Sequence, residues 1–196
     1  MSEYIYSKLS QPTSIRLLRL LPSKSDLENL SCELFEYDLQ NAARPYLPYE
    51  ALSYVWGGES GAFSILLDNR SLNITRNLHT MLSHLRARDW VRIIWVDAIC
   101  INQADEKEKE RQIPFMAEIY ARARYVLIWL GEAEDDGDEA LEAICLAGEI
   151  PERDSLPAET LSRMETSSEK IIKLLRRPWF QRIWVRIKGL NETLAK

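Results

Sequence analysis

The chain has 196 residues, of which 46% are hydrophobic and 28% are charged, and its formal net charge is −5. This balance is typical of a globular protein and excludes wholesale disorder. The negative charge argues against general binding to nucleic acid or to an anionic membrane. No run of 18 apolar residues is present, and the start of the chain lacks the pattern of a secretory signal. Three widely separated cysteines without a CxxC pair favour a reducing compartment, so we expect a cytoplasmic protein without a zinc site.

The first half of the chain predicts strands. Short apolar runs at residues 14–20, 30–39 and 49–56 are separated by prolines, glycines and polar residues. Two further runs within residues 64–74 flank Asp68, Asn69 and Arg70, which indicates a hairpin.

A helix follows the hairpin. Leu78, Met81, Leu82 and Leu85 recur at helical spacing, and Thr75 is placed to cap the helix at its N-terminus.

The middle of the chain reads as strand, helix and strand. Residues 91–96 and 125–130 are nearly continuous apolar runs, of the kind that parallel sheets bury on both faces. The helix between them spans residues 105–122, with Pro114 expected to kink it. This βαβ unit predicts an α/β fold with a mostly parallel sheet flanked by helices, to which the hairpin is added.

Charge is unevenly distributed after residue 131. Residues 132–169 are rich in acids and include a weak helical pattern at 139–147, followed by a loop at 151–157. Residues 170–188 are basic and contain Trp179, Phe180 and Trp184. We expect this basic segment to pack on the core as a helix, with contact to a membrane surface as the alternative.

Polar residues follow the strand at 91–96, where open α/β sheets bind ligands. Asp97 comes directly after the strand, and Asn102 and Gln103 lie in the same connection. Asp105 and Glu108 have the D-x-x-E spacing of a capping box, so a structural role is open for them too. Cys100, between two isoleucines, fits a small buried side chain better than a nucleophile.

The sequence Tyr54-Val55-Trp56-Gly57 ends the strand at 49–56. Aromatic side chains in strands usually belong to the core, but a tryptophan next to glycines also fits the wall of a pocket. The two histidines, His79 and His84, are spaced so that they point apart on a helix, so no metal site is predicted.

Several stretches together resemble the fungal heterokaryon-incompatibility (HET) domain. They are YEALSYVWG at 49–57, ITRNL at 74–78, WVDAICINQ at 95–103, VLIWLG at 126–131 and RPWFQRIWV at 177–185. The resemblance covers residues 49–186, which predicts N-terminal strands leading into the domain at 1–48 and a short divergent tail at 187–196.

The resemblance implies a function in self/non-self recognition between fungal individuals that leads to cell death. It also implies kinship with Toll/interleukin-receptor (TIR) domains, a flavodoxin-like sheet, and cleavage of NAD as a substrate by a carboxylate-assisted reaction. No cofactor or metal is expected. The candidate catalytic residues are Asp97 and Glu108. The candidate ligand-binding residues are Tyr54, Trp56, Gly57, Asn102, Gln103 and Trp129.

Two alternatives are open. The first is a non-catalytic module that assembles with itself or with other HET-domain proteins. The second is an inactive short form that competes with full-length relatives, because Ile187 and Lys188 follow the last motif where the family commonly has Gln-Glu. Neither alternative involves nucleic acid.

Overall fold

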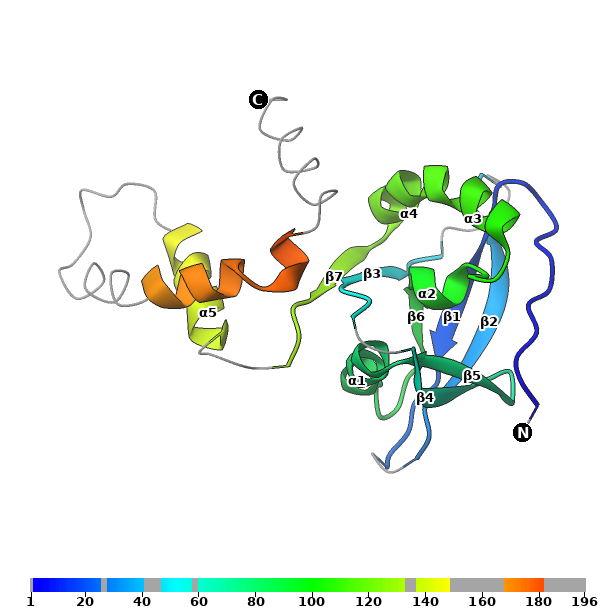
Figure 1. Ribbon diagram of the computed structural model, residues 1–196, viewed down its shortest axis with the longest axis horizontal. Helices are drawn as coiled ribbons and strands as arrows, with labels where there is room; N and C mark the ends of the chain where they lie inside the picture. Colours follow the sequence, from blue (N-terminus) through cyan, green and yellow to red (C-terminus); the bar gives the residue numbers. More distant parts are fainter. Residues whose placement is uncertain are drawn as a thin grey trace. The chain divides into compact units, whose positions relative to one another are not determined.

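The computed structural model describes residues 2–25, 28–40, 47–57, 60–132, 137–148 and 168–181. The chain forms two compact units, Met1–Trp129 and Leu130–Lys196. The first unit contains a seven-stranded sheet in the order β5-β4-β2-β1-β6-β3-β7 (Figure 1). The strands are β1 (Ser14–Leu20), β2 (Ser31–Asp38), β3 (Glu50–Tyr54), β4 (Ser60–Leu67), β5 (Arg70–Thr75), β6 (Arg92–Trp95) and β7 (Tyr125–Trp129).

Short helical elements connect the strands. They are α1 (Arg76–Leu85), α2 (Asp97–Cys100), α3 (Glu106–Gln112), the 3₁₀ turn η1 (Ile113–Phe115) and α4 (Met116–Arg122). The predicted kink at Pro114 is confirmed, since the proline lies in η1 and separates α3 from α4. The four-residue helix α2 was not expected from the sequence. It begins directly after β6 and buries Ile99 and Cys100.

The sheet is mixed, so the prediction of a mostly parallel sheet was wrong. β1 is antiparallel to both β2 and β6, and β4 is antiparallel to β5, whereas β2 and β4 are parallel over a short register. The antiparallel pairs include the longest ladder, β1 with β2. Close connections explain two of these antiparallel pairs, β1 with β2 and β4 with β5, because consecutive strands joined by a short link return alongside each other. The pairing of β1 with β6 joins strands that are far apart in the chain.

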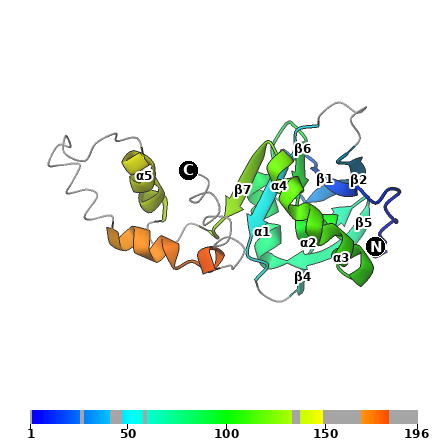
Figure 2. The same cartoon turned by 90° about the horizontal axis from the view of Figure 1, so that it is seen from above.

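The parallel part of the sheet is the trio β6, β3 and β7. β3 lies between the other two and is parallel to both. The helices between β6 and β7 form the predicted crossover, and Figure 2 shows them running across the sheet. Hydrogen bonds fix α4 to β3 and its approach, because the Tyr120 hydroxyl donates to Leu52 O at 3.0 Å and the Tyr49 hydroxyl to Ile119 O at 2.6 Å. Because β6, β3 and β7 are parallel, their carboxyl ends lie at the same edge of the sheet.

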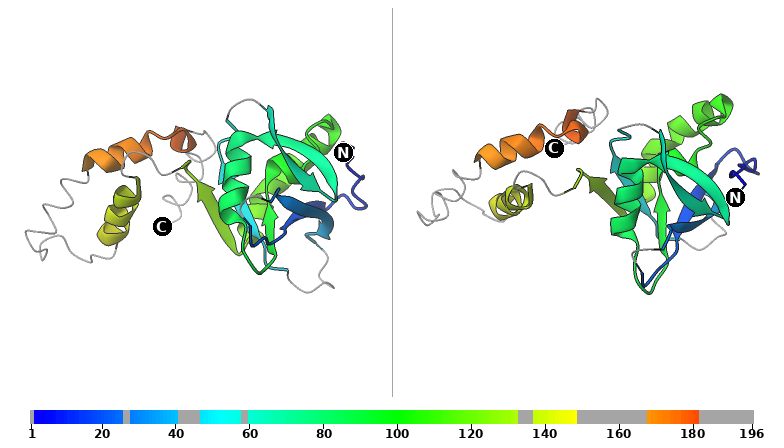
Figure 3. Two further views of the ribbon diagram at one scale, coloured as in Figure 1. Left: turned by 90° about the horizontal axis from the view of Figure 1, so that it is seen from below. Right: turned by 60° about the horizontal axis from the view of Figure 1, so that its bottom comes forward.

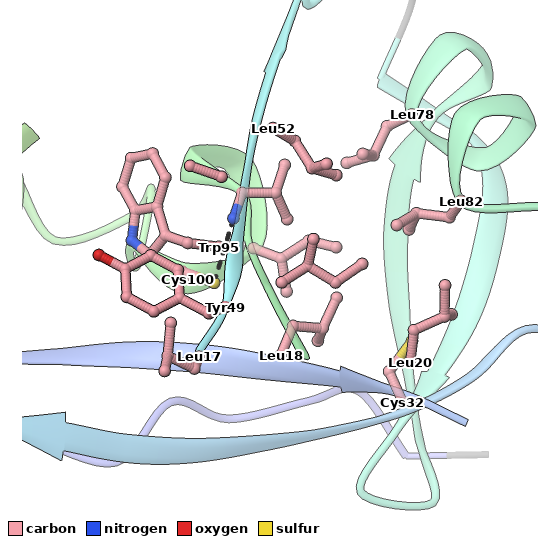
Figure 4. Packing of buried hydrophobic residues seen from close by; sticks show 14 of the residues in the cluster. Leu17, Leu18, Leu20, Cys32, Tyr49, Leu52, Leu78, Leu82, Trp95 and Cys100 are labelled. Carbon is pink, nitrogen blue, oxygen red and sulfur yellow. Dashed lines mark hydrogen bonds between the residues drawn. The ribbon is translucent and has the colours of Figure 1, made fainter. Parts of the chain in front are cut away.

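The core of the first unit lies between β1, β3, β6 and α1. Figure 4 shows Leu78 and Leu82 of α1 directed at the same cluster as Leu52 and Leu20. The predicted helical periodicity is thus confirmed, and so is the cap, because the Thr75 hydroxyl accepts from Leu78 N at 3.3 Å. Burying a leucine side chain contributes about 1.5–3 kcal/mol, so this cluster accounts for much of the stability of the unit.

The predicted hairpin is also confirmed. Asp68 and Asn69 connect β4 to β5 with φ values of 48° and 61°. Two consecutive residues with positive φ are the mark of a type I′ turn, whose twist matches that of the flanking strands. Figure 3 shows the resulting hairpin beside α1.

β7 departs from the prediction that it is buried on both faces. It pairs with β3 at the end of the sheet, and its side chains Tyr125, Val126 and Ile128 are about half exposed. An apolar run has the same appearance in a central and in an edge strand, which is why its burial could not be inferred from composition.

The second unit contains α5 (Gly137–Gly148), a helical stretch at residues 168–175 and the 3₁₀ turn η3 (Pro178–Gln181). The helix expected at 139–147 is therefore present, whereas the loop at 151–157 and the residues after 181 lie outside the described part. The acidic and basic segments meet where Lys170 forms an ion pair with Glu139. Leu174 and Trp179 of the basic segment are buried. Within the described residues, no helix is long and apolar enough to cross a membrane.

Candidate functional site

A cavity of about 740 Å³ opens in the first unit, beside the carboxyl end of β3. One wall comes from the N-terminal segment, residues 3–6. The others come from the end of β3 with Trp56 and Gly57, from residues 72–75 of β5, and from residues 102–104 after α2. The position agrees with the rule that α/β proteins bind ligands beyond the carboxyl ends of parallel strands.

The structure brings five of the eight predicted site residues to this cavity. Tyr54, Trp56, Gly57, Asn102 and Gln103 all line it. Tyr54 is also buried in the core, and its role in binding stays a prediction. Gly57 has a φ of +35°, a left-handed conformation that glycine adopts at little cost and that lets the chain turn after Trp56.

Asp97 lies next to the cavity and holds one of its walls. The Trp56 indole Nε1 donates to Asp97 Oδ2 at 2.9 Å, and the other oxygen, Oδ1, accepts from Ala98 N at 2.8 Å. Gln103 Nε2 donates to the carbonyl of Asp97 at 2.9 Å. Trp56 is 43% exposed, so a carboxylate fixes a large aromatic ring that is open to ligands.

Glu108 does not line the cavity and is almost fully buried. Its Oε1 and Oε2 accept from the two terminal nitrogens of Arg16 at 2.5 and 3.0 Å, and Oε1 also accepts from Asn102 N at 2.8 Å. Burial raises the pKa of Glu108, but the bonds from Arg16 and from Asn102 lower it more, so the net pKa is below its ordinary value. Glu108 is therefore placed to hold the loop that carries Asn102.

The capping-box interpretation is correct for only one of its two residues. Asp105 caps α3, because its Oδ1 accepts from Lys107 N at 3.0 Å and from Glu108 N at 3.2 Å. The reciprocal bond is absent, since Asp105 N donates to Asn102 O and the Glu108 carboxylate is directed at Arg16.

Arg16 was missed by sequence reasoning. It lies on β1, 92 residues from Glu108, and is almost fully buried. It also donates to Ser7 O at 2.6 Å and Cys100 O at 3.2 Å, and its guanidinium lies over the Tyr6 ring. The strand contains two arginines, Arg16 and Arg19, of which only Arg16 is buried. A buried charge needs a partner, but the sequence does not show which of the two arginines is buried.

Trp129 lies outside the cavity, although it was predicted to bind ligand. Its indole Nε1 donates to Asn77 Oδ1 at 2.8 Å, and its ring packs against His84. Asn77 Nδ2 donates in turn to Val55 O at 2.6 Å. Asn77 therefore ties the end of β7 to the backbone just before Trp56.

A comparison with known protein families shows which family this chain belongs to. The model of the family described as heterokaryon incompatibility protein (HET) matches residues 49–186. The chain belongs to the HET family.

The matched HET residues contain most of the site. One curated HET relative is the Neurospora crassa protein named heterokaryon incompatibility protein 6, OR allele, which is 36% identical over 155 residues. The alignment spans 72% of this chain but only 22% of the length of the Neurospora protein. No solved structure matches the chain significantly.

HET motifs that are far apart in sequence are joined by hydrogen bonds next to the cavity. Asn77 of ITRNL bonds the YVWG stretch to Trp129 of VLIWLG, and Asp97 of WVDAICINQ bonds Trp56. The N-terminal wall, residues 3–6, and Arg16 lie before the part that the HET model matches.

The buried cysteine of the third HET motif is not exposed to a ligand. Cys100 is 2% exposed, Val96 N donates to its sulfur at 3.5 Å, and burial raises its pKa to about 12. A thiol with such a pKa is protonated at neutral pH, which supports a packing role. The described residues contain no group of three or more His, Cys, Asp or Glu side chains that could hold a metal ion.

Proposed function

We propose that this chain acts in fungal self/non-self recognition and incompatibility cell death, in the cytoplasm, by cleaving NAD at the cavity beside β3. The family supports the biological role, and the resemblance of HET domains to TIR domains suggests the chemistry. The observation that carries the proposal is the Trp56–Asp97 pair, which sets an exposed aromatic ring and a carboxylate beside a cavity of about 740 Å³.

The proposed reaction is hydrolysis of the bond between nicotinamide and ribose. The C1′–N bond breaks, its electron pair stays with the nicotinamide nitrogen, and positive charge develops on the ribose as an oxocarbenium ion. Water then adds to C1′ and releases a proton. A carboxylate next to the developing charge stabilises this transition state, and Asp97 is the candidate for that role.

The remaining residues have supporting roles in the proposal. Trp56 offers an exposed ring for stacking, and the buried Tyr54 supports the wall of the cavity. Asn102 and Gln103 offer amide groups for ribose hydroxyls or for the carboxamide. Glu108 acts at a distance, because its contacts with Arg16 and Asn102 hold the wall that carries these amides.

Release of nicotinamide from NAD by the purified chain tests the proposal. We expect release by the wild type and a loss of about 100-fold for Asp97→Asn, the magnitude typical of removing one stabilising group from a transition state. Asp89→Asn, at an exposed aspartate outside the cavity, is the matched control and should retain activity. A folded wild type without any release would contradict the proposed chemistry.

A second candidate function is assembly without catalysis, with another copy or another HET-domain protein as partner. The observation that favours it is the edge strand β7, which exposes Tyr125, Val126 and Ile128. Open edge strands are templates for pairing with another chain. Val126→Lys should lower the average mass in light scattering if the edge mediates assembly, and an unchanged mass would contradict this function.

A further inference from the structure

The N-terminal wall of the cavity is held to the sheet by backbone pairing. Glu3 forms a parallel bridge with Ser71 of β5. Tyr4 N donates to Ser71 O at 2.9 Å, and Ser71 N donates to Ser2 O at 3.0 Å. Figures 1 and 3 show this segment, in dark blue, reaching the hairpin formed by β4 and β5. Residues 2–4 therefore act as an added strand at the β5 edge.

A second set of contacts holds the following residues. The Tyr6 hydroxyl donates to Ile99 O at 2.9 Å, and Arg16 donates to Ser7 O at 2.6 Å. Since Arg16 also binds Glu108, which accepts from Asn102 N, one buried ion pair connects the N-terminal wall to the wall that contains Asn102. The two walls are fixed relative to each other by shared contacts.

The chemistry of the lining is that of a site for a flat cation. The aromatic lining residues that are not fully buried are Tyr4, Tyr6 and Trp56, and Glu3 is an exposed acidic residue of the same lining. Among the described lining residues there is no lysine or arginine to neutralise a phosphate. Aromatic faces and a carboxylate both attract positive charge, and both disfavour an anion.

We infer that residues 2–7 make the cavity selective for a planar heteroaromatic cation, the class of an N-alkylated pyridinium ring, with any attached phosphate outside it. The inference rests on the proposed function only for the choice of ring, because a nicotinamide ring that carries ribose on its nitrogen is a cation of this class. The selecting carboxylate is that of Glu3, which lies before the residues matched by the HET family model.

Binding of small probes to the full chain tests this inference without any turnover. The probes are 1-methylnicotinamide, a cation, nicotinamide, its neutral counterpart, and nicotinic acid, an anion, each titrated by calorimetry. We expect the cation to bind most tightly and the anion least. Glu3→Gln should weaken binding of the cation by about two- to fivefold, the range for an exposed charge pair, and leave nicotinamide binding unchanged.

The control variant is Glu110→Gln, at an exposed glutamate that does not line the cavity. It should change the binding of no probe. Equal affinities for the cation and its neutral counterpart, no binding of the cation to folded wild type, or equal effects of Glu3→Gln and Glu110→Gln would each overturn the inference.

The outcome is separable from that of the proposed function. Cation binding that depends on Glu3, with no cleavage of NAD, would leave the inference standing and reject the proposed chemistry. Cleavage of NAD without preference for the cation would support the proposed chemistry and reject the inference.

Discussion

Glu108 and Arg16 form a buried ion pair in which two guanidinium nitrogens donate to the two carboxylate oxygens at 2.5 and 3.0 Å. The pair joins β1 to α3 and also binds Ser7 O, directly after the N-terminal wall of the cavity, and Asn102 N in another of its walls. A residue that the sequence suggested as catalytic is therefore placed as a clamp between the two walls of the site.

Removing one member of this pair should destabilise the protein strongly. Glu108→Ala leaves the Arg16 charge buried without its partner, which costs about 3–5 kcal/mol. The free energy of unfolding in urea measures the loss. The double variant Arg16→Met, Glu108→Leu removes both charges and should recover most of it. A Glu108→Ala protein as stable as wild type would show that the pair contributes nothing.

The same pair predicts a dependence of stability on pH. The folded pKa of Glu108 lies below its ordinary value of 4.5, so at intermediate pH the unfolded chain binds more protons at this site. Stability from Glu108 is therefore complete above about pH 4.5 and is lost as the pH falls through the folded pKa. Glu36 shifts in the same direction, so the difference between wild type and Glu108→Gln isolates the effect. The prediction would be contradicted if the difference in unfolding free energy between the two proteins stayed constant between pH 6 and pH 3.

Asn77 should hold the end of β7 against the site. Asn77→Ala removes the bonds to Val55 O and to the Trp129 indole, at a cost of about 1–3 kcal/mol for partners left partly buried. Faster hydrogen exchange at the Trp129 indole, observed by NMR, would report the loss directly. Ser83→Ala, on the exposed side of the same helix, is the control. Unchanged exchange in Asn77→Ala would show that other contacts hold Trp129.

The three cysteines should differ sharply in reactivity. Cys32 and Cys100 are buried, and burial raises the pKa of each to about 12, whereas Cys145 is exposed. A thiol reagent at neutral pH should label Cys145 in the folded protein and the other two only after unfolding. Cys145→Ser should abolish the rapid labelling of the folded protein. Rapid labelling of Cys100 in the folded protein would contradict its packing role.

The parts of the fold that could be predicted have local causes. The leucine spacing and Thr75 identify α1, the Asp68-Asn69 turn identifies the hairpin, and Pro114 marks the break between α3 and α4. Trp56 was predictable at the cavity for a similar reason, because it follows a strand end where ligands commonly bind.

The rest depends on contacts between distant residues. Nothing near Arg16 in the sequence points to Glu108, and no local pattern places β1 antiparallel to β6 in the middle of the sheet. The exposure of Val126 has the same origin, because it depends on which strand lies at the edge. Such features are fixed by packing across the whole unit and not by the local sequence.

The most direct test of the proposed function is a double-mutant cycle on the Trp56–Asp97 pair, with nicotinamide release from NAD as the readout. Trp56→Phe keeps an aromatic ring but removes the N–H that donates to Asp97. We predict that Asp97→Asn loses about 100-fold. We also predict that the effects of the two substitutions are coupled and not additive. No release by the folded wild type, or full release by Asp97→Asn, would contradict the account.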